Sequence, residues 1–227
     1  GYGISPTRSY LQGEAEKARQ DPAELGKFLR LHLGIRTKQV TRYIDLGEWD
    51  ATAGMVDEAL LQGHRCHAGL DLASVEDVTA LSLLFPATDG SYDALWRFWL
   101  PEDRIPALNK RTAGEADVWV RQGWLRTTPG NVVDNDEIVR QILRDGQTFQ
   151  VKTLAYDRWG ATDVVRRLGD DGLDCVPTGQ GYQSMSGPMK ELLRLTKQQR
   201  LRHGGNPVMR WMIDNLAVDI DSAANVK

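Results

Sequence analysis

Residues 66–81, CHAGLDLASVEDVTAL, decide the fold of this chain. The apolar run HAGLDLA contains Asp71, and after a short polar break a second acid, Asp77, begins the run DVTALSLLFPA. Both runs are short and apolar, and between them they contain β-branched residues, which is typical of buried strands. The stretch therefore predicts a hairpin whose first strand ends in a carboxylate.

Downstream of this hairpin, strand and helix patterns alternate. The turn TDGSY and the run DALWRFWLP extend the hairpin into an antiparallel meander. The segment VDNDEIVRQILRDG predicts a helix with Asp134 or Asn135 as its N-cap and its end at Gly146. A strand FQVKTLAYD, a helix GATDVVRRLGDDG, a strand LDCVPT and a helix PMKELLRLTKQQRLRHGG follow. This order predicts a mixed α/β sheet with helices on its faces.

Residues 1–64 have a different composition. They contain helix formers, with Pro22 as a first-turn residue of a second helix, and then RYIDLGEWDATAG, whose aromatic residues we expect to be exposed in an irregular or short helical context. We expect residues 1–64 to be a linker or arm that packs onto the main domain, residues 65–227.

The composition sets limits on the class of protein. The 227 residues are 41% hydrophobic and 26% charged, which is ordinary for a soluble globular protein, and the net charge of −3 gives no overall attraction to nucleic acid or membrane. The two cysteines, Cys66 and Cys175, have no zinc spacing, so a reducing compartment is expected. Without an apolar run near the ~20 residues of a membrane span and without a signal peptide, we expect a cytosolic protein or a fragment of one.

Two acids stand at the ends of predicted strands, Asp71 and Asp157. If these strands are neighbours, the two carboxylates repel each other unless a cation lies between them. Oxygen ligands suit magnesium, and two metals about 3.5–4 Å apart can activate water and stabilise the leaving oxygen of a phosphodiester. The pattern indicates a metal-dependent nuclease, although a single strand-end aspartate is also typical of a turn former or a helix cap.

Four blocks in order, GLDLASVEDVTAL, LAYDRWGA, QGYQSMSGPMKEL and NPVMRWMIDNLAV, resemble the C-terminal nuclease domain of tailed-phage large terminase subunits. Upstream, FLRLHLG and YIDLGEWDA resemble the segment that joins the packaging ATPase to this nuclease. The resemblance implies a ribonuclease H-like fold, shared with RuvC-type resolvases and retroviral integrases, and two-metal hydrolysis with Mg²⁺ or Mn²⁺. It makes Asp71 and Asp157 catalytic metal ligands and Asp77 a supporting acid, although Asp77 could equally be the polar start of a strand.

The resemblance also implies a substrate and partners. The expected substrate is concatemeric double-stranded phage DNA, cut during genome packaging. The expected partners are the ATPase domain of the same full-length chain, the small terminase subunit and the portal protein, with no membrane. The expected location is the host cytoplasm, transiently at the portal of the procapsid.

The sequence departs from the family pattern in two places. It has no GxxxxGK[ST] motif, so the ATPase module is absent and a nuclease-domain fragment is expected. The family's last carboxylate lies on a C-terminal helix that we expect beyond Lys227. Asp214 and Asp221 are nearby acids that we keep as candidate ligands, although neither matches that helix position.

Basic residues are concentrated between Lys190 and Arg210. Lys190, Arg194 and Lys197 are spaced i, i+4, i+7, which places them on one face of a helix. Together with Arg158, Arg200 and Arg202 they are candidate DNA-phosphate contacts, and a solvated helix face is the alternative. The preceding segment, TGQGYQSMSGP, is expected to be a Gly/Ser-rich loop.

Other functions are compatible with the same residues. The domain could be a non-catalytic docking or DNA-binding module of the packaging motor, or another ribonuclease H-like enzyme such as a resolvase. An actin-like ATPase fits less well, because DLASVED lacks the glycine of a phosphate-binding turn.

Overall fold

The computed structural model describes residues 7–20, 28, 32, 43–73, 77–157 and 161–227. The chain forms two compact units, residues 1–43 with 215–217 and residues 44–214 with 218–227. The first unit contains helix α1 (Arg8–Gln20). The helix predicted to begin at Pro22 lies outside the described residues. The role of residues 1–64 as an arm following an ATPase domain stays a prediction.

One mixed sheet forms the centre of the second unit. Its strands follow the order β4-β3-β2-β1-β5-β6, and β7 also pairs with β3. The meander of β1, β2 and β3 is antiparallel, whereas β5 is parallel to β1 and β6 is parallel to β5. The strands are β1 (Arg65–Asp71), β2 (Thr79–Pro86), β3 (Tyr92–Pro101), β4 (Arg126–Thr128), β5 (Gln150–Asp157), β6 (Cys175–Thr178) and β7 (Leu201–Arg202). The predicted meander and mixed sheet are confirmed.

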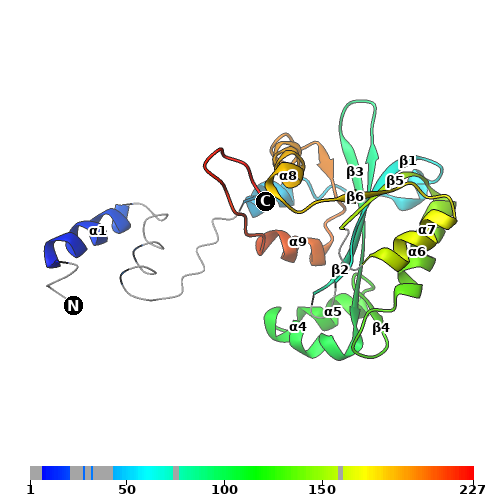
Figure 1. Cartoon of the computed structure of the whole chain (residues 1–227), viewed down its shortest axis with the longest axis horizontal. Coiled ribbons are helices and arrows are strands. Elements are labelled where there is room, and N and C mark those ends of the chain that lie inside the picture. Colours follow the sequence, from blue (N-terminus) through cyan, green and yellow to red (C-terminus); the bar gives the residue numbers. More distant parts are fainter. Residues whose placement is uncertain (1–6, 21–27, 29–31, 33–42, 74–76, 158–160) are drawn as a thin grey trace. The chain divides into compact units, whose positions relative to one another are not determined.

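Helices cover both faces of this sheet (Figure 1). On one face lie α6 (Asn135–Thr148) and α7 (Thr162–Asp170), and on the other lie α8 (Tyr182–Lys197) and α9 (Pro207–Asp214). The side chains of Ile138, Val164 and Leu168 from the first pair join the buried faces of β1, β2 and β5 in one core. A second core packs Phe98 of β3 against α9 and the two short helices α4 (Ile105–Arg111) and α5 (Glu115–Arg121).

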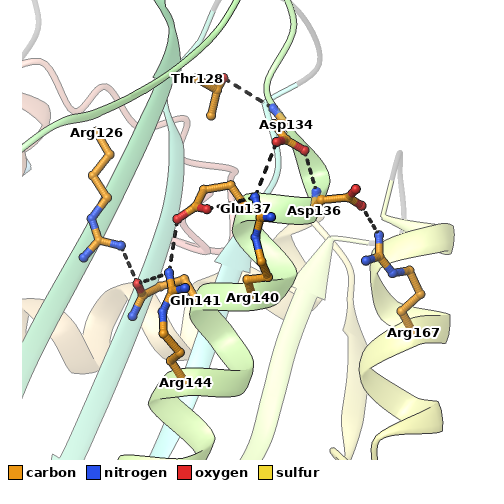
Figure 2. A network of polar contacts seen from close by, with 9 residues as sticks. All are labelled: Arg126, Thr128, Asp134, Asp136, Glu137, Arg140, Gln141, Arg144 and Arg167. Atoms are coloured by element: carbon orange, nitrogen blue, oxygen red, sulfur yellow. Dashed lines mark hydrogen bonds and ion pairs between the residues drawn. The ribbon is translucent and has the colours of Figure 1, made fainter.

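A polar network fixes the beginning of α6 (Figure 2). Of the two predicted N-cap candidates, Asp134 is the N-cap, because its carboxylate accepts the backbone N–H of Asp136 at 2.8 Å. The carboxylate of Asp136 in turn pairs with Arg167 of α7 at 2.6 Å. The predicted end at Gly146 was two residues short, because this glycine stays helical and the helix ends at Thr148.

The expectation that the aromatic residues of RYIDLGEWDATAG are exposed is wrong for Trp49. It belongs to the short helix α3 (Leu46–Ala51) and is fully buried. Its ring stacks on His203 with the ring centroids 4.0 Å apart, and the Trp49 carbonyl lies 2.9 Å from His203 Nε2. Between α3 and β1 lies the 3-10 helix η1 (Glu58–Leu61), and after β3 comes a second one, η2 (Glu102–Arg104).

The predicted Gly/Ser-rich loop of residues 178–188 is also corrected. Helix α8 begins at Tyr182, after Gly181 as its N-cap, and continues through Pro188 to Lys197. Inside it, Ser186 is buried, and its hydroxyl accepts the backbone N–H of Val226 at 3.2 Å. A tertiary contact therefore supports a helix that local propensity disfavours. Within the described part of the chain, no helix is long and apolar enough to span a membrane.

Candidate metal centre at the ends of two parallel strands

Asp71 and Asp157 end two neighbouring strands of the sheet. Strands β1 and β5 run parallel, with Leu70 opposite Tyr156, so the next residue of each strand is an aspartate at the same edge. Antiparallel β2 begins here too, with Ala80 opposite Asp71. The two strands are therefore neighbours, which brings two carboxylates together at the carboxyl ends of parallel strands.

The surroundings of Asp71 disfavour its charged form. Asp71 keeps solvent access as the last residue of β1, yet the protein around it removes part of the water from its carboxylate. This desolvation raises its pKa, and the negative charges of Asp157 and then Asp77 raise it further. A divalent cation between the carboxylates would offset all three effects.

The floor of the site is a flat strip of small residues. Gly69 lies two positions before Asp71, and a Cβ atom on it would come within 2.9 Å of Ser82 Oγ on β2. A larger residue at position 69 would require the Ser82 side chain to move. The glycine therefore keeps the sheet surface beside the carboxylates open.

Gln180 is a site residue that the sequence analysis missed. Its Nε2 donates a hydrogen bond of 2.6 Å to Asp157 Oδ2. Thr178 at the end of β6 pairs with Asp157, so the chain that leaves β6 passes directly by the carboxylate. The sequence contains Gln180 in the segment TGQG, directly after a predicted strand of the same sheet. Only the order of the strands in the sheet places this segment beside Asp157.

An open pocket of about 500 Å³ adjoins the two carboxylates. Its polar end contains Asp71, Asp157 and Gln180. Its walls are mainly apolar and come from the sheet face and from helices α8 and α9: Trp96, Phe98, Tyr156, Met185, Met209 and Met212. The carboxylates are thus accessible from a groove of molecular size.

The remaining predicted acids occupy different positions. Asp77 lies in a bend two residues before β2, and its charge acts on Asp71. Asp214 is the last residue of α9. Asp221 is engaged locally: its carboxylate accepts the side-chain amide of Asn225 at 2.9 Å and two backbone N–H groups, and these hydrogen bonds lower its pKa. Within the described ranges, no three His, Cys, Asp or Glu side chains are grouped to hold a metal ion.

Comparison with known proteins identifies the family. The family model for the terminase large subunit, endonuclease domain, matches residues 2–227. The chain belongs to this family. It is 34% identical over 217 residues to the terminase large subunit of Enterobacteria phage HK97, covering 94% of this chain and 42% of that protein. It is 30% identical over 226 residues to protein YmfN of Escherichia coli K12, covering 94% and 49%.

A solved terminase structure has the same fold. The crystal structure of the HK97 bacteriophage large terminase matches with a TM-score of 0.74 and 32% identity, over 99% of this chain and 47% of that chain. The predicted ribonuclease H-like fold is confirmed. This terminase chain spans less than half the length of the relatives it matches.

The predicted DNA contacts lie mostly on the surface of α8. Lys190, Arg194 and Lys197 are exposed there. Arg194 Nε and Nη2 donate to the two oxygens of Glu191 at 2.7 and 2.6 Å.

Downstream, Arg202 binds both carboxylate oxygens of Asp93 at 2.5 and 2.9 Å, and Arg200 Nη1 donates to the backbone carbonyl of Asp89 at 3.4 Å. Arg158 lies outside the described residues. The role of these cations in binding DNA stays a prediction.

Proposed function

We propose that this terminase domain is a divalent-metal-dependent endodeoxyribonuclease that cuts concatemeric double-stranded phage DNA during genome packaging. The observation that carries the proposal is the pair Asp71 and Asp157 at the ends of adjacent parallel strands. Desolvation first, and then the negative charge of Asp157, raise the pKa of Asp71, and such a raised pKa is typical of a site that binds a cation. Family membership adds support for the nuclease role.

The ligand set fits Mg²⁺ or Mn²⁺, because it consists of carboxylate oxygens beside an open groove. When bound, the metal ions would activate water and stabilise the leaving oxygen of the phosphodiester. Asp71 and Asp157 would hold the metal, and Gln180 would orient Asp157 through its hydrogen bond. Asp77 would add negative charge at the same edge. We propose that a further carboxylate from outside the described residues completes the site.

The surroundings of the pair are compatible with a DNA substrate. Helix α8 begins two residues after Gln180 and carries exposed Lys190 and Lys197 along its length. Lysines at these positions can neutralise phosphates without reading bases, which suits cleavage with little sequence preference. The ATPase domain, the small subunit and the portal are the proposed partners of the full-length protein.

Plasmid nicking tests the proposal. Supercoiled plasmid is incubated with Mn²⁺ or Mg²⁺ and the wild type, Asp71→Ala or Asp157→Ala, with Asp117→Ala on the exposed surface of α5 as the matched control. We expect nicking by the wild type and the control and a loss of at least ~100-fold in both site variants. The same comparison is made in the full-length terminase.

The outcomes separate the candidate functions. Absence of nicking in both the domain and the full-length terminase would favour the docking or DNA-binding module. Normal cutting by both site variants would reject the assignment of Asp71 and Asp157.

A further inference from the structure

The outer edge of β3 is interrupted. At its beginning β3 pairs with β7, up to Asp93 opposite Arg202, and at its end it pairs with β4, from Trp99 opposite Arg126. No strand in the described part of the chain pairs with residues 94–98 on this edge. The interval from residue 93 to residue 99 spans about 20 Å at ~3.3 Å per residue. We call this interval the β3 gap.

The backbone of Trp96 faces the β3 gap. Tyr92 donates its N–H to the carbonyl of Arg200 at 2.8 Å, so Tyr92 faces away from β2. The register between β2 and β3 is continuous from Tyr92 to Trp99, and alternate residues of an antiparallel strand face the same neighbour. Trp96, four positions after Tyr92, therefore directs both its N–H and its C=O into the gap. A donor and an acceptor on one residue match the pairing needs of an added strand.

A pocket of about 340 Å³ lies at the gap, and it shares Trp96 and Phe98 with the groove at the carboxylates. It is bounded at one end by His203 and Gly204, which follow β7, and at the other by Gly123 and Trp124, which precede β4. Val56 also lines it, and Trp124 is 39% exposed. The volume is in the range of small ligand pockets, so side-chain packing leaves this interval of the edge accessible.

Charge in this pocket favours an anionic group. Arg97 and Arg126 both line it, and Arg97 is neutralised by Glu58 and Asp145. Arg126 donates to the neutral side-chain oxygen of Gln141 (Figure 2), and among the described residues no carboxylate lies within ion-pair distance of it. Desolvation first, and then the charge of Arg97, lower the pKa of Arg126, while the charges of Asp145 and Glu137 offset part of this shift. A carboxylate bound to Arg126 would offset the repulsion from Arg97.

We propose that the β3 gap is a docking site for a short extended segment of a partner protein that carries an aspartate or glutamate. The segment would pair with the free backbone groups of Trp96, as an added strand does at a sheet edge, and its carboxylate would bind Arg126. A peptide fits better than a phosphate, because the gap offers a backbone acceptor beside the donors. Neither Asp71 nor Asp157 lines this pocket.

The first test is amide hydrogen exchange followed by NMR. In the free protein we expect the Trp96 amide to exchange at least ~10-fold faster than those of Leu95 and Arg97, which face β2. Exchange of Trp96 as slow as that of its neighbours would show that the edge is already occupied and would overturn the proposal.

The second test uses a panel of acetylated, amidated pentapeptides with a central glutamate flanked by valine, isoleucine, threonine or tyrosine. We expect members of this panel to shift and protect the Trp96 amide, and to bind about 10-fold more tightly than the same peptides with glutamine in place of glutamate. N-methylation of the residues that face β3 should abolish binding. Binding by none of the panel, equal binding of glutamate and glutamine peptides, or a shift caused by duplex DNA instead would each reject the proposal.

Two variants locate the carboxylate. Arg126→Gln should reduce binding of glutamate peptides to the level of the glutamine peptides, whereas Arg121→Gln, on the exposed end of α5, should leave it unchanged. If Arg126→Gln proves unstable, the comparison of glutamate and glutamine peptides on the wild type still decides whether a carboxylate contributes to binding. Equal loss in both variants would contradict a specific carboxylate contact.

Discussion

The ionised form of Asp71 carries an electrostatic cost that has a consequence for stability. Its pKa is raised in the folded state by desolvation and by Asp157 and Asp77. A carboxyl group with a raised folded pKa favours folding only at low pH, and this contribution is lost as the pH rises through the folded pKa. At neutral pH, without metal, the ionised Asp71 therefore destabilises the fold.

Replacing Asp71 by asparagine should remove this cost. In EDTA at pH 7 we expect Asp71→Asn to unfold at a higher urea concentration than the wild type, with the difference shrinking toward pH 4, where the wild-type group takes up its proton. Added Mg²⁺ should stabilise the wild type and leave the variant unchanged. Asp117→Asn serves as the control, and a wild type that is more stable than Asp71→Asn in EDTA at pH 7 would contradict the account.

Gln180 acts through Asp157 and is a positioning residue. Its Nε2 donates a hydrogen bond of 2.6 Å to Asp157 Oδ2, and this bond fixes the direction of the carboxylate. Removing such a support typically weakens metal binding by about 10- to 100-fold. We expect Gln180→Ala to raise the Mn²⁺ concentration needed for half-maximal nicking by this factor, with cutting recovered at saturating metal. Gln183→Ala, exposed on α8, should match the wild type, and a defect that saturating metal does not rescue would contradict the assignment.

At the level of the elements, His203, which lies between β7 and α9, connects this part of the chain to α3. Its Nε2 donates to the Trp49 carbonyl, and its Nδ1 accepts the N–H of Gly205 at 3.3 Å, so both ring nitrogens are used by the neutral form. Burial lowers the pKa of His203, while the backbone carbonyl of Trp49 and the charge of Asp50 raise it by less. Asp50 itself is paired with Arg210.

Acidification should therefore weaken the attachment of α3. The folded pKa of His203 is depressed, so its stabilising contribution is present above its ordinary pKa near 6.5 and is lost as the pH falls toward the folded value. Between pH 7.5 and 5.5 we expect the unfolding free energy of the wild type to fall more steeply than that of His203→Gln, by at most about 1.4 kcal/mol per pH unit. His64→Gln, on an exposed histidine, should keep the wild-type slope, and equal slopes in all three proteins would refute the mechanism.

At the scale of the whole molecule, local patterns in the sequence predict much of the fold and half of the site. The alternation around Asp71, the N-cap at Asp134 and the strand ending at Asp157 are local signals, and each is found where expected. The sheet order that places β6 beside β5 is a long-range property, which is why Gln180 was missed. The burial of Trp49 likewise depends on His203, 154 positions away.

The two short strands, β4 and β7, could not be predicted from local sequence patterns either. Strands β4 and β7 contain three and two residues, too few for a periodic pattern, and both exist because they pair with β3. Helix α8 extends through glycine and proline positions because Ser186 is buried against Val226. In each case tertiary contacts override local propensity.

If Asp71 and Asp157 share a divalent cation, anomalous diffraction from crystals soaked in Mn²⁺ will locate the ion between their carboxylates. We predict an anomalous peak within ligand distance of a carboxylate oxygen from each residue, about 2.0–2.3 Å, in the wild type. The peak should be absent from Asp157→Asn crystals soaked in the same way. A wild-type peak only at other carboxylates, or one that persists unchanged in Asp157→Asn, would contradict the assignment of this edge of the sheet as the metal centre.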